Sequence, residues 1–314
     1  MFPTMDVYAR AYQPRKRRLP QLILALLVIG ASFTFMTTLR SEPIISPIPE
    51  ETHQKTSLPR FFAKKKTPSE LGRLIEKEIA GTWKNYSIYV KDYNSDFELG
   101  INEAVIYTAA SVNKMPILAA LYYYAQKGEI DLDESITLQE ADIQDYGTGI
   151  LRYETPGSTY SVKTLALLMI QKSDNTSAYI LANNIIGIER LQELVTSWGM
   201  GQTDIANNKT SNKDIGVLFE KMVTNKIANK AYTDEMLSFL KETDFEDRIP
   251  SQLPKDVTVY HKIGTEVRTI HDVGIVTNGK RTYYVGIFTT DVLDEGDTIK
   301  LIARISKIVY DVMR

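Results

Sequence analysis

The order of predicted strands and helices is the feature that most constrains the fold of this chain. Alternating apolar and polar residues predict strands over residues 86–93, 257–262, 272–277 and 282–290, and a turn at residues 94–96 predicts a further strand directly after the first. Residues 110–241 separate the first two of these strands from the others, and their apolar side chains recur mostly at helical spacing. We therefore expect an α+β domain, in which both chain ends form one antiparallel sheet with flanking helices, beside an all-helical lobe.

A second constraint is the uncharged, apolar run of residues 21–39. As a helix this run spans roughly 28 Å, close to the hydrocarbon thickness of a bilayer. The basic residues Arg15 to Arg18 precede it, and the positive-inside rule then keeps residues 1–20 in the cytoplasm. A cleaved signal peptide is the competing interpretation, but no clear small-x-small cleavage site follows the run. The sequence favours an uncleaved transmembrane anchor at the cell membrane.

The remaining chain divides into a tether and a folded domain. Residues 41–68 contain five prolines and no periodic apolar pattern, which predicts an extended extracytoplasmic tether over residues 40–68. A cap pattern at Thr67-Pro68 then begins an amphipathic helix, and a second amphipathic helix is predicted over residues 298–312. We expect one folded domain, residues 69–314, on the extracytoplasmic side of the membrane.

Composition excludes several classes of chemistry. The formal net charge of −2 gives no basic field, so nucleic acid is not an expected partner. The chain has no cysteine, which excludes disulfides, cysteine-bound metals and thiol nucleophiles. Its three histidines are His53, His261 and His271, too few for a site built from several imidazoles. We predict no metal and no cofactor, and no sequence pattern predicts an oligomeric state.

The first of three short motifs is Ser111-Val112-Asn113-Lys114, at the start of an apolar helix. Side chains three positions apart lie on one face of a helix, so Ser111 and Lys114 can form a hydrogen bond. A serine hydroxyl needs an adjacent base, and lysine can be that base when burial or nearby cations depress its pKa. The pattern alone is weak, since Ser238 and Lys241 repeat it without further support.

The second motif is Ser173-Asp174-Asn175, at a predicted break between two helices. A serine there can shuttle a proton, and an asparagine can orient a substrate amide. A helix cap explains the same three residue types equally well.

The third motif is Lys262-Ile263-Gly264-Thr265, at the end of a predicted strand. Glycine permits close approach of a ligand to the backbone, and lysine offers positive charge to a carboxylate. The backbone N–H groups of Thr265 and Ser111 are candidates for an oxyanion hole. A strand that ends in a turn would explain this motif if it stood alone.

Together and in this order, the three motifs resemble those of the class A β-lactamase and penicillin-binding-protein superfamily. The resemblance covers residues 69–314 and extends to the segments NNKTSNKDIG and HDVGIV. It implies the β-lactamase and transpeptidase fold, and an acyl-enzyme on Ser111 with Lys114 as base and Ser173 as proton relay.

The resemblance also implies a substrate-binding set. Lys262, with Gly264 and Thr265, would recognise the substrate carboxylate, and Asn175 would contact an amide group. In the family pattern the position of Ile263 is usually threonine, whose hydroxyl helps to hold that carboxylate. We consider Arg268 or His271 as residues that compensate for the missing hydroxyl.

A second departure concerns release of the acyl group. Class A β-lactamases carry a Glu, on a loop after the second motif, that activates the hydrolytic water. Residues 197–216 contain no Glu, and their only carboxylates are Asp204 and Asp214. We expect Asp204 to be an exposed turn residue rather than a replacement base.

The sequence therefore predicts a membrane-anchored serine hydrolase that acylates on Ser111 with β-lactams or with D-amino-acid stem peptides of peptidoglycan. Deacylation is expected to be slow. The alternative is a non-catalytic wall-binding or sensor module that retains the pocket. A Ser-His-Asp hydrolase that uses His271 and Asp272 is disfavoured, because no Gly-x-Ser-x-Gly elbow is present.

Overall fold

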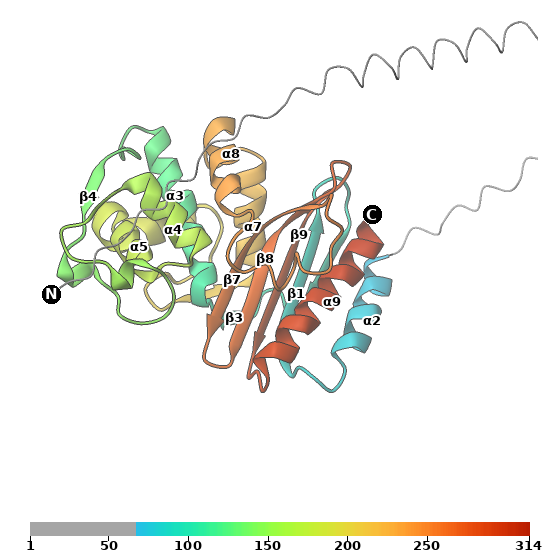
Figure 1. Cartoon of the computed structure of the whole chain (residues 1–314). Helices are drawn as coiled ribbons and strands as arrows, with labels where there is room; N and C mark the ends of the chain where they lie inside the picture. Colours follow the sequence, from blue (N-terminus) through green and yellow to red (C-terminus); the bar gives the residue numbers. More distant parts are fainter. Residues whose placement is uncertain (1–66) are drawn as a thin grey trace, which may run out of the picture. The chain divides into compact units, whose positions relative to one another are not determined.

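The computed structural model describes residues 67–314 (Figure 1). The predicted cytoplasmic segment and transmembrane anchor, and almost all of the predicted tether, lie outside the described residues. Within residues 67–314, no helix is both long enough and apolar enough to cross a bilayer.

A five-stranded antiparallel sheet is formed by both ends of the described chain, as the sequence predicts. Its strands are β1 (Asn85–Asp92), β2 (Glu98–Ile101), β7 (Thr258–Glu266), β8 (Thr269–Thr277) and β9 (Thr282–Thr290), in the order β2-β1-β9-β8-β7. The antiparallel pairing of β1 with β9, which sets Ile88 opposite Ile287, joins the first strand to the last. Both side chains are fully buried, so the closing contact of the sheet lies in a core.

One face of the sheet is covered by the first and last described helices, α2 (Pro68–Ile79) and α9 (Glu295–Met313) (Figure 1). The Thr67 hydroxyl caps α2 by accepting a hydrogen bond from the Glu70 N–H, and Pro68 occupies the first helical turn. Leu71 and Ile75, one helical turn apart, pack with apolar residues of β1, β9 and α9 in a buried cluster. The predicted helices at both ends of the domain are thus confirmed.

The other face supports a largely helical lobe (Figure 1). Its helices are α3 (Lys114–Gln126), α4 (Val162–Gln171), α5 (Asn175–Tyr179), α6 (Ile188–Ser197), α7 (Asn212–Val223) and α8 (Lys230–Phe239), with a π-helical turn (Ile180–Ile186) between α5 and α6. Helix α3 is apolar around almost its whole circumference and is buried by its neighbours. It is the central helix of the lobe and starts next to the sheet.

Two small ladders depart from the predicted all-helical lobe. Strand β4 (Ser135–Thr137) pairs with β5 (Thr159–Ser161) inside the lobe, and β3 (Ile106–Thr108) pairs with β6 (Lys209–Ser211) at its edge. Each strand has three residues, too few for an alternating pattern to stand out in the sequence.

Candidate active site

The candidate nucleophile Ser111 lies in a 3₁₀ turn, Ala110–Asn113, immediately before α3. Ala110 has a φ of 47°, in the left-handed region that costs an L-residue free energy. Lys114 is the first residue of α3, and its Nζ atom donates a hydrogen bond of 3.0 Å to Ser111 Oγ. The predicted contact between the two side chains of the first motif is therefore present.

The second motif places Ser173 beside the same amine. Helix α4 ends at Gln171 and α5 begins at Asn175, and Ser173 in the break has a φ of 53°. Lys114 Nζ lies 2.5 Å from the Ser173 carbonyl oxygen, 3.2 Å from Ser173 Oγ and 2.8 Å from Asn175 Oδ1. The amine of Lys114 thus joins the first motif to the second.

Asp174, the central residue of that motif, has a structural role. Its buried carboxylate caps α5 through the Ser177 N–H and accepts hydrogen bonds from the backbone N–H groups of Ile150 and Leu151. The helix-cap interpretation of the motif is correct for this residue. The cap fixes the strained loop that presents Ser173.

The third motif reaches Ser173 from the sheet. Lys262, on β7 and 1 % exposed, donates a hydrogen bond of 2.9 Å from Nζ to Ser173 Oγ. Both buried amines, those of Lys114 and Lys262, therefore contact one hydroxyl group. Burial lowers the pKa of Lys114 to about 7, and the charge of Asp174 opposes that shift in part. Burial, and next the nearby charge of Lys114, hold the pKa of Lys262 well below its usual value.

Gly264 brings this part of β7 against the serine turn. A β-carbon at Gly264 would lie 3.0 Å from the Ala109 carbonyl oxygen and 3.1 Å from Val112 Cγ2. A side chain at this position would require β7 or the serine turn to shift by a few tenths of an ångström. Thr265, the next residue, is exposed and lines a cleft together with Ser111.

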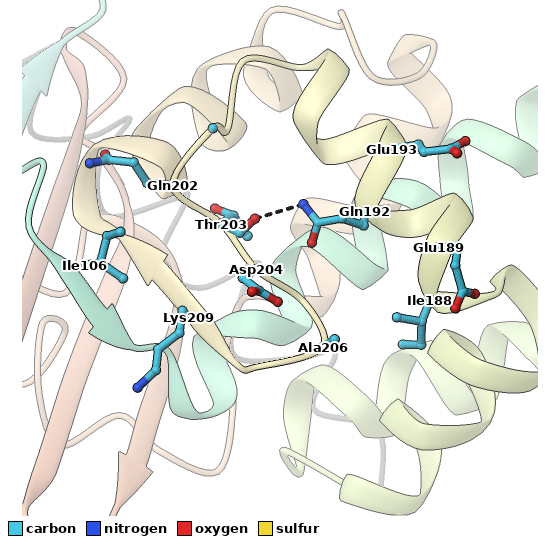
Figure 2. A pocket seen from close by; sticks show the side chains of 11 residues that line it. Ile106, Ile188, Glu189, Gln192, Glu193, Gln202, Thr203, Asp204, Ala206 and Lys209 are labelled. Atoms are coloured by element: carbon cyan, nitrogen blue, oxygen red, sulfur yellow. Dashed lines mark hydrogen bonds between the residues drawn. The ribbon is translucent and has the colours of Figure 1, made fainter.

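This cleft has a volume of about 650 Å³ and is lined by residues of all three motifs, with Tyr146, Tyr179 and Asn208 on its other walls. Among the lining residues within 67–314, the single carboxylate is that of Glu266, at the end of β7. Asp204 lies in a neighbouring groove instead (Figure 2).

In the neighbouring groove, Asp204 is part of a turn. Its carboxylate accepts hydrogen bonds from the backbone and side chain of Asn207, and these bonds lower its pKa. Gln192 of α6 bridges to the same turn, with its Nε2 2.9 Å from the Thr203 carbonyl oxygen (Figure 2). Asp204 is thus held as a turn residue, as expected.

Neither Arg268 nor His271 lines the cleft beside Thr265, so the expectation that one of them replaces the missing hydroxyl is wrong. Arg268 is exposed, 3.7 Å from Asp291. His271 is fully buried, and its Nε2 lies 2.8 Å from the Thr108 carbonyl oxygen. Burial lowers the pKa of His271 to about 4, so its ring is neutral at pH 7. Arg268 lies in the turn between β7 and β8, and His271 lies on β8 with its ring against Thr108.

A different cation, Arg248, contacts Thr265 at this end of β7. It precedes β7 in sequence, is 4 % exposed, and donates from Nη2 to Thr265 Oγ1 at 2.8 Å. Its Nη1 donates to the His271 carbonyl oxygen at 2.7 Å. No sequence motif points to Arg248, because the residue lies in a loop fourteen positions before Lys262.

The fold and this cleft define the class of the protein. A sheet formed by both chain ends, a helical lobe, and a serine beside a buried lysine are the marks of acyl-transferring serine hydrolases of the β-lactamase and penicillin-binding-protein type. More particularly, the chain belongs to the beta-lactamase enzyme family, whose model matches residues 70–313.

Individual relatives agree with this assignment. The chain is 25% identical to β-lactamase VEB-1 of Pseudomonas aeruginosa over 73% of this chain and 86% of the relative. The solved structure of PBP-A has a TM-score of 0.73 and 25% identity, and the match covers 79% of this chain and 97% of PBP-A. A class A β-lactamase from Bacteroides cellulosilyticus DSM 14838 gives a TM-score of 0.72 and 25% identity, over 79% and 98% of the two chains.

One prediction concerns His261, which is fully buried behind the site between Asp272 and Glu246. Burial would lower the pKa of His261, but the two carboxylates outweigh burial and raise it to about 9. Because this pKa is higher in the folded than in the unfolded chain, protonated His261 stabilises the fold. The stabilisation is complete at pH values below the unfolded pKa of about 6.5, and it is lost as the pH rises through 9. We expect this loss of stabilisation, between pH 6 and pH 9.5, to amount to about 3 kcal/mol.

The measurement is the difference in unfolding free energy between the wild type and His261→Asn, at pH 6 and at pH 9.5. Both proteins contain the buried lysines, whose lowered pKa values make stability rise with pH. The contribution of these lysines is therefore removed when one free energy is subtracted from the other. The difference in unfolding free energy should be smaller at pH 9.5 than at pH 6. An equal difference at both pH values would show that His261 is not charged in the folded protein.

Proposed function

We propose that this protein forms an acyl-enzyme on Ser111 with β-lactams or with D-amino-acid peptides of the cell wall. One observation carries the proposal, the hydrogen bond of 3.0 Å between Ser111 Oγ and a buried Lys114 whose pKa is about 7. A lysine with that pKa is about half unprotonated at neutral pH, and the unprotonated amine can accept the serine proton.

In the proposed reaction, Lys114 Nζ takes the proton of the Ser111 hydroxyl while Oγ bonds to the substrate carbonyl carbon. The backbone N–H groups of Ser111 and Thr265 stabilise the oxyanion that forms. The C–N bond of the substrate then breaks, and the leaving nitrogen takes a proton. Ser173 supplies it, because its hydroxyl lies between the amines of Lys114 and Lys262, from which it regains a proton.

The substrate would be held at two ends. Asn175, whose Oδ1 contacts Lys114 and whose Nδ2 donates to the Tyr146 carbonyl oxygen, lies where it can bind a substrate amide. Thr265 and Arg248 supply a hydroxyl and a guanidinium for a carboxylate, next to Lys262. Support for a β-lactam comes from PBP-A, one mutant of which is described as an acyl-enzyme complex with penicillin G.

Release of the acyl group is proposed to be slow. The cleft-lining carboxylate within the described residues is Glu266, beside Thr265 rather than behind the serine turn, and Asp204 belongs to the separate groove. A water molecule that attacks the ester therefore lacks an evident carboxylate base. The protein would behave as a penicillin-binding protein more than as a resistance enzyme.

Incubation with penicillin G and intact-mass measurement tests this proposal. We expect a covalent adduct that persists, and no adduct in Ser111→Ala. Ser238→Ala is the matched control, since Ser238 and Lys241 form the second Ser-x-x-Lys and Ser238 is bonded to its own helix at the Glu235 carbonyl oxygen. Rapid drug loss without an adduct would indicate a hydrolytic β-lactamase. No reaction would favour the non-catalytic binding module.

The acylation rate should depend on pH through Lys114. Because the amine must be unprotonated to act as base, the rate constant should rise about tenfold per pH unit below 7 and level off above it. Stopped-flow measurement with a chromogenic cephalosporin gives this profile. Lys114→Arg, which stays protonated, should lower the rate at least a hundredfold at pH 8. A rate that is independent of pH between 5 and 9 would contradict the assignment of the base.

We also propose that the domain is held at the outer face of the cell membrane by residues 21–39, on the grounds of the apolar run and the basic cluster before it. The full chain should sediment with membranes and resist extraction by high salt. Deletion of residues 1–40 should release it. A mature protein whose measured mass lacks these residues would instead establish a cleaved signal peptide.

A further inference from the structure

We propose that His261 is a positioning residue, which fixes Arg248 in place for recognition of the substrate carboxylate. The inference rests on the proposed function, and it names a side chain that touches no surface of the cleft. His261 lies on β7 next to Lys262, but it contacts the loop that carries Arg248.

The guanidinium of Arg248 is oriented by the ends of two strands. It donates to the carbonyl oxygens of Gly264 and His271 and to the hydroxyl of Thr265. Thr265 lines the cleft, so Arg248 lies directly behind the residue that a substrate would meet. Its position behind Thr265 therefore depends on where its own loop is held.

The loop is held on both sides of Arg248, and His261 takes part in each contact. On one side, His261 Nδ1 lies 2.8 Å from Asp272 Oδ1, and Asp272 Oδ2 accepts a hydrogen bond of 2.9 Å from the Ile249 N–H. On the other side, His261 Nε2 lies 3.2 Å from Glu246 Oε1. Residues 246 and 249 flank Arg248, so the imidazole holds the loop directly at Glu246 and, through Asp272, at Ile249.

Both contacts require an imidazolium. A neutral imidazole has one N–H, whereas each of the two carboxylates needs a donor. The charged groups that face the ring are Asp272 from β8 and Glu246 from the loop, with Arg248 and Lys262 as the nearby cations. The raised pKa of His261, about 9, agrees with a ring that carries both protons at neutral pH.

A purely structural role for His261 predicts a different outcome. If the ring only stabilised the domain, its loss would affect every ligand alike. If it acts through Arg248, its loss weakens only ligands that carry a carboxylate. Penicillin G and its methyl ester differ in that group alone, so the ratio of their dissociation constants isolates the effect.

The experiment measures both dissociation constants by calorimetry in a Ser111→Ala background, where binding is separated from acylation. The Ser111→Ala protein, the parent of the other variants, should bind the acid at least tenfold more tightly than the ester, because only the acid can form a charge-assisted contact. His261→Gln, which keeps a donor near Nε2 but loses the one to Asp272, should remove most of that preference. His261→Asn, which keeps the donor near Nδ1, should retain more of it.

Two further measurements separate an effect on binding from an effect on folding. Glu246→Gln changes a side chain that is 43% exposed and should reduce the preference without unfolding the domain. Addition of His261→Gln to Arg248→Gln should have no further effect on the preference, because the two residues act in series. In the parent, the preference should fall as the pH rises through 9.

Equal binding of acid and ester by the parent would overturn the inference, as would equal weakening of both ligands by His261→Gln. Additive effects of the two substitutions would also overturn it. Acylation is measured separately in the unsubstituted protein. A chain that binds the acid selectively without forming an adduct therefore refutes the proposed chemistry and leaves the positioning role standing.

Discussion

The hydroxyl group of Ser173, which is shared by two buried amines, is the contact on which the rest of this molecule depends. Lys114 approaches it from the central helix of the lobe and Lys262 from the sheet, with Nζ to Oγ distances of 3.2 and 2.9 Å. Two ammonium groups this close and this buried repel one another, so the pair favours loss of a proton. Burial lowers the pKa of Lys114 to about 7, and in the proposed reaction its unprotonated amine is the base beside Ser111.

The fold explains how this contact is maintained. Backbone strain at Ala110 and Ser173, both with positive φ, persists only where the surroundings enforce it. The buried Asp174 enforces it at Ser173 by binding the Ile150 and Leu151 N–H groups, and Gly264 allows β7 to approach the serine turn. The site is thus preorganised by groups that do not themselves take part in the proposed acyl transfer.

The parts of the molecule that are encoded by short stretches of sequence could be predicted from the sequence. The sheet from both chain ends, the terminal helices and the three motifs were predictable, because periodicity and short spacing encode them. Arg248 was not predictable, since its role arises from the path of a loop that brings it behind Thr265. The same limit applies to His271, which the sequence offered as a contact for the carboxylate but which is buried and neutral at pH 7. Its orientation follows from the register of β8 against β9.

Direct titration of the Lys114 amine tests the central claim. Nitrogen-15 labelling of lysine side chains, with assignment by comparison with Lys114→Arg, gives the pKa of this one group by NMR. We expect a midpoint near pH 7, below those of exposed lysines in the same spectrum. A midpoint above 10 would mean that Lys114 remains an ammonium ion at neutral pH. It could then not accept the proton of Ser111, and the proposed acyl transfer would need another base.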